Sequence, residues 1–310
     1  MNWKLKLLLA FIKLRDAKNK GNITVELLRN EMKQGSKLGN FLFSDFIQIK
    51  KVKDINIQGR HGTIPVRMYD NLGTPNQTTI VFFHGGGFVV GDLESHDYVC
   101  RHLCKQNQAV VVSVDYRLSP EFKFPYALED AYDATKWVQD NISKINGNKE
   151  KIIVMGDSAG GNLAAGVSIQ ARDLGELKIA GQILIYPWVD ATFNHPSYKE
   201  NGEGYLLTQR NLDFFDLQYV PDGLDKKDPT LSPIFTKDFK NLPIAFIATA
   251  QYDPLRDEGY EYAKLLKKEG VQTQYIEYKN MVHGFFNIPK IGEEAMQCYK
   301  DVNQFIATNF

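Results

Sequence analysis

The chain has 310 residues, of which 43% are hydrophobic and 24% are charged, as is usual for a globular protein with a sizeable core. Its 37 basic and 37 acidic side chains cancel, so there is no basic excess to attract phosphates and no nucleic-acid partner is expected. Cys100, Cys104 and Cys298 are too few for a disulfide framework, and we therefore expect reduced thiols and a cytoplasmic protein.

The N-terminal stretch MNWKLKLLLAFIKLR combines early lysines with an apolar run, as a signal peptide does. However, Lys13 interrupts the run and no small-residue cleavage site follows, and the run is far too short to span a bilayer. Leu5, Leu8, Leu9 and Ile12 share one helical stripe, which predicts an amphipathic helix whose apolar side docks on another surface. A helix lying on a membrane surface is the alternative, and no stable membrane insertion is expected.

Secondary structure can be predicted in chain order from the periodicity of apolar residues. Residues 1–45 are predicted to be helical, with breaks near Gly21 and Gly35-Ser36. Strands are then expected at 46–57, 62–70, 78–85, 109–116, 151–155, 180–188, 244–254 and 272–280. Helices are expected at 95–107, 125–144, after Ser158, and at 208–220, 256–269 and 292–308. Strands that alternate with helices predict a parallel, doubly wound α/β sheet of about eight strands.

One connection is too long for this alternation. About fifty-five residues separate the strand that ends near Trp188 from the strand that begins near Ile244, which is far more than an ordinary connection needs. We interpret this segment as an insertion over the sheet edge that forms a small helical cap with the N-terminal helices. The expected division is residues 1–45 for the first part of the cap, 191–241 for the second part, and 46–190 with 242–310 for the catalytic domain.

The segment KIIVMGDSAGGNLAAG (151–166) places Ser158 on a tight turn between a buried strand and a helix. Gly156 and Gly160 allow a strained backbone there, and Asp157 and Ala159 fill the positions between them and the serine. The turn exposes the hydroxyl at the carboxyl edge of the sheet and at a helix N-terminus, where developing negative charge is favoured. Gly-x-Ser-x-Gly in this context predicts a nucleophilic serine.

A serine nucleophile needs a base and a group that orients the base, and in this type of fold they follow in the order Ser, acid, His. Asp253 comes just after the penultimate strand and His283 just after the last one. Either residue alone could be a helix cap or a loop histidine, but together with Ser158 their order and positions predict a triad. Asp257 is the rival acid, although it lies inside the following helix.

The segment FFHGGGFVVG (82–91) follows the third predicted strand. Its glycines would let backbone N–H groups point into a site unobstructed by side chains, so we expect oxyanion donors from Gly86 and Gly87, with a third from Ala159. A glycine-rich turn without catalytic use is the alternative. Gly85 belongs to the same motif, and we expect His84 to hold the loop in place rather than to act as a base.

Other ligand motifs are not matched. Residues 156–163 lack the lysine and hydroxyl residue of a phosphate loop, the glycines at 85–91 do not form Gly-x-Gly-x-x-Gly, and there is no His-Glu-x-x-His. Cys100 and Cys104 could in principle ligate a metal, but no matching His or Cys pair lies nearby in the sequence. No metal and no cofactor are therefore expected.

The sequence resembles the hormone-sensitive-lipase-like branch of the α/β-hydrolases, which includes bacterial carboxylesterases. The resemblance covers about residues 65–290 and rests on HGGGF, VVGDLESHD, DYRLSPEFKFPYALED, GDSAGGNLA, DPLRDEG and HGFF, with GYLLT and DPTLSP in the insertion. It implies an eight-stranded, mostly parallel sheet with one antiparallel strand, helices on both faces and a two-part helical cap. It also implies Ser158 as nucleophile, His283 as base and Asp253 as its orienter. Phe88 departs from the tryptophan of many members.

The expected activity is cofactor-free hydrolysis of short- to medium-chain carboxylic esters through an acyl-enzyme. An amidase or formamidase could use the same triad, and a ligand receptor on an inactive hydrolase is the non-enzymatic alternative. The expected partner is a small-molecule ester, and a homodimer is an option that the sequence leaves open. Aromatic residues of the proposed cap would either line an apolar pocket or only hold the cap together: Phe41, Phe43, Tyr205, Phe214, Phe215 and Tyr219.

Overall fold

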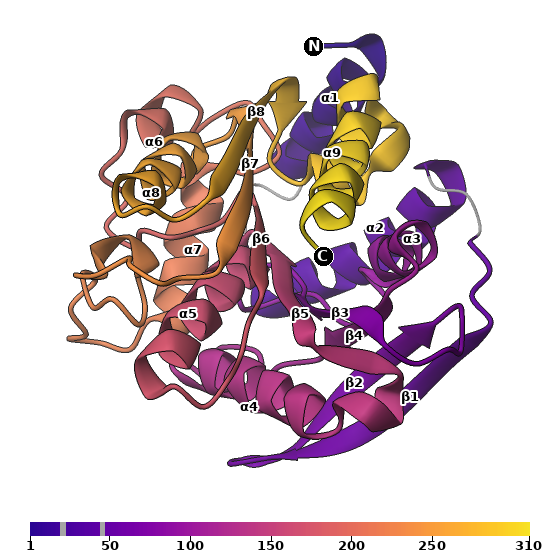
Figure 1. Cartoon of the computed structure of the whole chain (residues 1–310). Coiled ribbons are helices and arrows are strands. Elements are labelled where there is room, and N and C mark those ends of the chain that lie inside the picture. Colours follow the sequence, from indigo (N-terminus) through magenta and orange to yellow (C-terminus); the bar gives the residue numbers. More distant parts are fainter. Residues whose placement is uncertain (19–22, 44–46) are drawn as a thin grey trace.

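Eight strands form one sheet in the computed structural model of the chain, which describes residues 1–18, 23–43 and 47–310, without the side chains of 15–18 and 36–43 (Figure 1). The strands are β1 (Lys51–Gly59), β2 (Gly62–Asp70), β3 (Gln77–Phe83), β4 (Val110–Val114), β5 (Gly147–Asp157), β6 (Gly181–Ile185), β7 (Ile244–Tyr252) and β8 (Thr273–Val282). Their order is β1-β2-β4-β3-β5-β6-β7-β8. Only β2 runs against its neighbours β1 and β4, and β3 to β8 are parallel. The predicted α/β-hydrolase fold with one antiparallel strand is confirmed.

Helices cover both faces of the sheet (Figure 1). One face carries α4 (Tyr126–Asp140), α5 (Ala159–Leu174) and α8 (Arg256–Lys268), and the other carries α3 (Asp97–Asn107) and α9 (Glu293–Asn309). The remaining helices are α1 (Trp3–Lys18), α2 (Val25–Phe43), α6 (Pro196–Glu200) and α7 (Gln209–Tyr219), with short 3-10 turns at Ile142–Ile145, Pro233–Phe235, Phe285–Asn287 and Pro289–Ile291.

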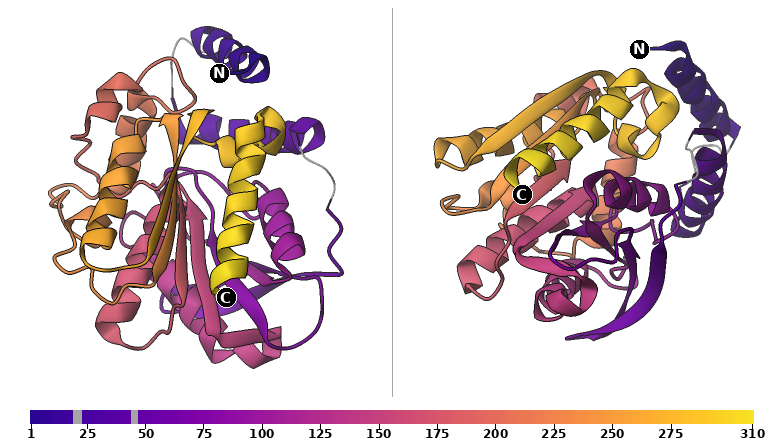
Figure 2. Two further views of the ribbon diagram at one scale, coloured as in Figure 1. Left: turned by 45° about the horizontal axis from the view of Figure 1, so that its top comes forward. Right: turned by 45° about the vertical axis from the view of Figure 1, so that its right-hand side comes forward.

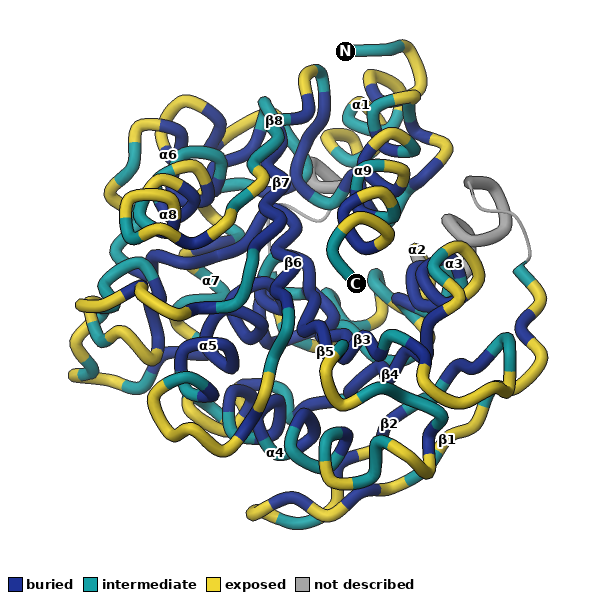
Figure 3. Tube along the Cα trace, viewed as in Figure 1, coloured by how far each residue is buried: buried dark blue, intermediate teal, exposed yellow. Residues whose placement is uncertain are grey.

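The central strands contain continuous buried apolar runs, such as Ile80–Phe83 in β3 and Ile152–Met155 in β5, because both faces of the sheet are covered there (Figure 3). In β3, Val81 and Phe83 belong to the core under α4 and α5, whereas Ile80 and Phe82 belong to the core under α3 and α9. The continuous run that predicted this strand therefore divides its side chains between two cores.

Several predicted boundaries were wrong, including those of the strand predicted at 151–155, which spans Gly147–Asp157. The break at Gly35-Ser36 does not exist, because α2 runs through it; a helical glycine costs only about 1 kcal/mol, which a longer packed helix can absorb. The first strand begins at Lys51 rather than at residue 46, and the helix predicted to reach residue 144 ends at Asp140 and continues as a 3-10 turn. The predicted break at Gly21 and the side chains of Phe41 and Phe43 lie outside the described residues.

The helices outside the sheet layers gather at one edge. The long connection between β6 and β7 contains α6 and α7, and Figure 2 shows α1 and α2 on the side of the sheet where the parallel strands end. Among the described residues, no helix combines the length and the apolar character that crossing a bilayer requires. The additional helices therefore lie over the carboxyl edge of the sheet, from which the loops after the parallel strands emerge.

Candidate active site

Ser158 lies where β5 ends and α5 begins, with a backbone φ of 55° that is unusual for a residue with a side chain. Its amide donates to the Ile185 carbonyl (2.8 Å), and its carbonyl accepts from Trp188 N (3.2 Å), so the turn is fixed to the end of β6. A Cβ on Gly156 would collide with the Gly160 carbonyl, and one on Gly160 would collide with the Phe83 carbonyl. The two glycines of the motif are therefore required by close backbone packing.

The structure brings Ser158, His283 and Asp253 together. His283 Nε2 lies 2.9 Å from Ser158 Oγ, and its Nδ1 lies 2.8 Å from Asp253 Oδ2. Asp253 directly follows Tyr252, the last residue of β7, and His283 directly follows Val282, the last residue of β8. Asp253 is fully buried and its other oxygen accepts from Leu255 N (2.8 Å), which fixes the carboxylate. This arrangement can pass a proton from the hydroxyl to the imidazole.

Asp257, the rival acid, has other partners. Its oxygens accept from Ser197 N (2.9 Å) and Arg256 Nε (2.8 Å), so it joins α8 to α6 and is not the carboxylate beside His283.

Asn201 was not predicted from the sequence, although its side-chain amide donates from the insertion to the backbone carbonyl of Asp253 (3.3 Å). An isolated asparagine in a loop gives no pattern from which such a contact could be predicted.

The glycine loop lies beside Ser158 because β3, which it follows, pairs directly with β5. Gly86 has a φ of 124°, a conformation that favours glycine, and a Cβ there would collide with the Val90 carbonyl. The backbone N–H groups of Gly86, Gly87 and Ala159 donate to no acceptor within the described part of the chain. Free donors beside the serine are what stabilisation of an oxyanion requires.

Asp157 connects the loops around the serine. Its carboxylate is buried and accepts from Gly85 N (2.9 Å) and Asn287 Nδ2 (3.0 Å), and His96 Nε2 lies 3.2 Å away. Burial raises the pKa of this carboxyl, but His96 and Asn287 outweigh it, so the pKa lies below the usual range. His96 and Asn287 were not identified from the sequence as part of the site, since neither stands at a strand end.

His84 contributes to the loop as a structural side chain. Its ring stacks on Tyr116 (4.3 Å between centroids), its Nδ1 lies 2.8 Å from the Gly85 carbonyl, and its own carbonyl accepts from the Tyr116 hydroxyl (2.7 Å). Burial, with repulsion from His96, lowers the pKa of His84 to about 4. The ring is therefore neutral near pH 7, and its contacts attach it to Tyr116 and to the loop.

Because His84 is neutral in the folded protein, we predict that acid lowers stability at pH values well above those at which carboxylates titrate. Burial also lowers the pKa of His102 to about 4, whereas both histidines titrate near 6.5 in an unfolded chain. Between these values the unfolded chain binds more protons, so the free energy of unfolding should fall by up to about 2 kcal/mol per histidine from about pH 7 to pH 5. Urea unfolding at the two pH values measures this change.

His102→Phe is the matched control for this prediction, since the new ring can keep the contact with Tyr299 (4.3 Å between centroids) without a titrating group. The variant should lose about half of the acid-induced change while its stability at neutral pH stays similar. Equal unfolding free energies of the unmodified chain at both pH values would contradict the prediction.

Aromatic side chains of α7 cover the glycine loop. Phe88, with a φ of 61°, stacks on Tyr219 (3.7 Å between centroids), and a Cβ on Gly87 would run into the ring of Phe215. From α2, Arg29 donates to the Val89 carbonyl (3.0 Å) and pairs with Glu121 (2.7 Å). Both additional helical segments therefore contact the loop that presents the free amides.

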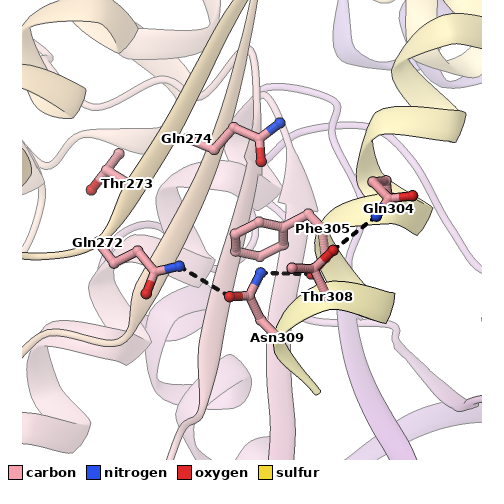
Figure 4. Close-up of a pocket in the computed structure, with 7 residues that line it drawn as sticks. All are labelled: Gln272, Thr273, Gln274, Gln304, Phe305, Thr308 and Asn309. Carbon is pink, nitrogen blue, oxygen red and sulfur yellow. Dashed lines mark hydrogen bonds between the residues drawn. The ribbon is translucent and has the colours of Figure 1, made fainter.

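No group of three or more His, Cys, Asp or Glu side chains in the described chain is arranged to hold a metal ion. Two cavities lie away from the serine: one of about 430 Å³ between α5 and the insertion, and one of about 260 Å³ between β8 and α9 (Figure 4). The latter is lined by uncharged side chains: Gln272, Thr273, Gln274, Gln304, Phe305, Thr308 and Asn309. None of these side chains is ionisable, so this cavity offers no general base.

A sheet of this order, with a serine on the turn after β5 and an acid and a histidine after β7 and β8, defines an α/β-hydrolase. Comparison with known proteins agrees, since a family model described as the alpha/beta hydrolase fold matches residues 80–287.

Individual relatives support the same family. The carboxylic ester hydrolase LipN of Mycobacterium tuberculosis is 41% identical over 247 residues, which are 78% of this chain and 66% of LipN. The carboxylesterase NlhH of the same organism is 42% identical over 239 residues, 76% of this chain and 75% of NlhH. The solved structure of an esterase from Pyrobaculum calidifontis superposes with a TM-score of 0.91 at 42% identity, covering 99% of this chain and 98% of that one. The chain belongs to the hormone-sensitive-lipase-like family of α/β-hydrolases and is a carboxylic ester hydrolase.

Proposed function

We propose that the protein hydrolyses short- to medium-chain carboxylic esters, with Ser158 as nucleophile, His283 as general base and Asp253 as the carboxylate that orients the histidine. The observation that carries this assignment is the pair of short distances from His283 to Ser158 Oγ (2.9 Å) and to Asp253 Oδ2 (2.8 Å). Asp253 accepts from Nδ1–H and so leaves Nε2 free to accept the serine proton.

The reaction proceeds in two displacements. Ser158 Oγ attacks the ester carbonyl while His283 Nε2 takes its proton, and the N–H groups of Gly86, Gly87 and Ala159 bind the oxyanion. His283 then protonates the leaving alcohol, and the acyl group stays on Ser158. In the second displacement His283 activates a water molecule, which releases the acid and restores the hydroxyl. Asp253 stabilises the imidazolium formed in each half-reaction.

The proposed cap consists of residues 1–45 and 191–241, placed over a catalytic domain of residues 46–190 and 242–310. This division is supported by Arg29, which joins α2 to the glycine loop, and by Phe215, which covers that loop from α7. We further propose a cytoplasmic location, in keeping with three free, buried cysteines. The homodimer stays a prediction.

Acyl-chain preference tests the substrate class. The ring of Phe215 lies against the loop that would bind the oxyanion, so it limits the space above the serine. We expect kcat/KM for p-nitrophenyl butyrate to exceed that for the palmitate ester by about tenfold or more, and Phe215→Ala to narrow the difference. Phe214→Ala, on the neighbouring position of α7, is the matched control. A preference for palmitate would overturn the proposed chain length without affecting the proposed triad.

Labelling with a fluorophosphonate tests the nucleophile. The reagent should attach to Ser158 in the native chain, as shown by mass spectrometry of the digest, and should not attach to Ser158→Ala. Measuring the turnover of an ester and of the amide with the same acyl group separates esterase from amidase activity. Labelling of a different serine would overturn the assignment of Ser158.

A further inference from the structure

Helix α1 has two apolar faces, of which only one contacts the protein. On the inner face Leu5 is fully buried, and Leu8 and Leu9 pack against the core under α3 and α9. The start of the helix is anchored by the terminal amino group, which donates to Asn280 (2.6 Å), and by Asn2, which donates to the Ile291 carbonyl (2.7 Å). The predicted stripe is therefore docked, but the helix is not amphipathic as predicted, because its opposite face is also apolar.

The outer face carries large apolar side chains in water. At 100° per residue, positions 3, 7, 11 and 14 fall on the side opposite Leu5. The exposed fractions are 67% for Trp3, 61% for Leu7, 65% for Phe11 and 73% for Leu14. These are four of the nine exposed large hydrophobic residues of the described chain. A continuous apolar stripe of this kind marks an interaction surface, unlike single exposed leucines.

Lysines border this stripe on both sides. Lys4 lies along one flank, and Lys6 and Lys13 lie along the other; all three are exposed, and residues 1–14 contain no acidic side chain. The whole chain has no net charge, so the positive charge here is local. A second copy of the chain docked symmetrically on this face would bring the same lysines against one another, because a two-fold interface pairs identical surfaces. An anionic surface is the complementary partner.

We propose that the outer face of α1, defined as Trp3, Leu7, Phe11 and Leu14 with the flanking lysines, binds the surface of membranes that contain anionic lipid. The apolar side chains enter the region between head groups and acyl chains, the lysines contact lipid phosphates, and the helix lies parallel to the membrane. Because α1 is anchored next to the loops beyond β8, this orientation turns the edge of the sheet that carries His283 toward the lipid (Figure 2). The proposal does not depend on the reaction that the site performs.

Vesicle flotation with the full chain tests the proposal. The protein should float with vesicles of phosphatidylglycerol and phosphatidylcholine and much less with phosphatidylcholine alone, and binding should weaken at high salt. Lys6→Gln/Lys13→Gln should lower the partition coefficient on the order of tenfold. Phe11→Ser/Leu14→Ser should abolish flotation, whereas Leu174→Ser/Leu217→Ser, which alters two exposed leucines elsewhere, should not.

Fluorescence provides a second readout. Of the three tryptophans only Trp3 is exposed, since Trp188 is buried and Trp137 is partly buried against the core, so a blue shift on adding the anionic vesicles should disappear in Trp3→Phe. Turnover of p-nitrophenyl acetate without vesicles shows that each variant is folded. The proposal is overturned if the native chain does not float at low salt. It is equally overturned if Phe11→Ser/Leu14→Ser floats as well as the control Leu174→Ser/Leu217→Ser. It is also overturned if the outer-face variants instead abolish a concentration-dependent self-association, which would identify a second copy as the occupant.

Discussion

Replacing Ser158 with alanine is expected to lower kcat for a p-nitrophenyl ester by roughly 10⁵- to 10⁶-fold, with little change in KM. The reason is that the Ser158 hydroxyl, which lies 2.9 Å from His283 Nε2, would form the bond to the acyl group. Without it no acyl-enzyme can form. Steady-state kinetics with the ester in excess over the enzyme measures the loss of kcat.

The same reasoning predicts that the triad acts as one unit. His283→Ala should lose nearly as much activity as Ser158→Ala, and the double variant should be no slower than either single variant, because the residual rate comes from the free amides and from binding. Ser168→Ala is the matched control, since Ser168 lies on the same helix and its hydroxyl donates only to the Ala164 carbonyl (2.8 Å). Multiplicative losses in the double variant would show that the two residues act independently.

The placement of the candidate site could be predicted from the sequence because it depends on strand ends. Ser158 and Asp253 follow apolar runs and His283 follows a strand of mixed polar and apolar residues, and parallel strands bring their carboxyl ends to one edge of a sheet. The glycine loop was predictable for the same reason, once β3 was placed beside β5.

The remaining features depend on contacts that leave no periodic signal. Asp157 was recognised as part of the motif, but its partners His96 and Asn287 are far away in the sequence and could be identified only in three dimensions. The helix α2 was split at Gly35 because a local preference was given too much weight against tertiary packing. The exposed stripe of α1 was overlooked because Leu5 and its neighbours already accounted for an amphipathic pattern.

A second large effect is expected from Gly160→Ala. The added methyl group would meet the carbonyl of Phe83, and neither β3 nor the start of α5 can move without disturbing the turn at Ser158. We expect the free energy of unfolding to fall by about 3 kcal/mol or more, as overpacking against rigid backbone does. Urea unfolding followed by circular dichroism measures it.

Gly35→Ala separates this packing effect from the general cost or benefit of alanine in a helix. Gly35 lies inside α2 with no atom within 4 Å of a Cβ placed there, so alanine should stabilise the protein by about 0.5 to 1 kcal/mol. Opposite signs for the two substitutions follow from their surroundings, since the chemical change is identical. If Gly160→Ala kept full stability, the loop and strand around Ser158 would have to be free to shift. The hydroxyl would then have no fixed position relative to His283, and the geometry on which the proposed mechanism depends would be lost.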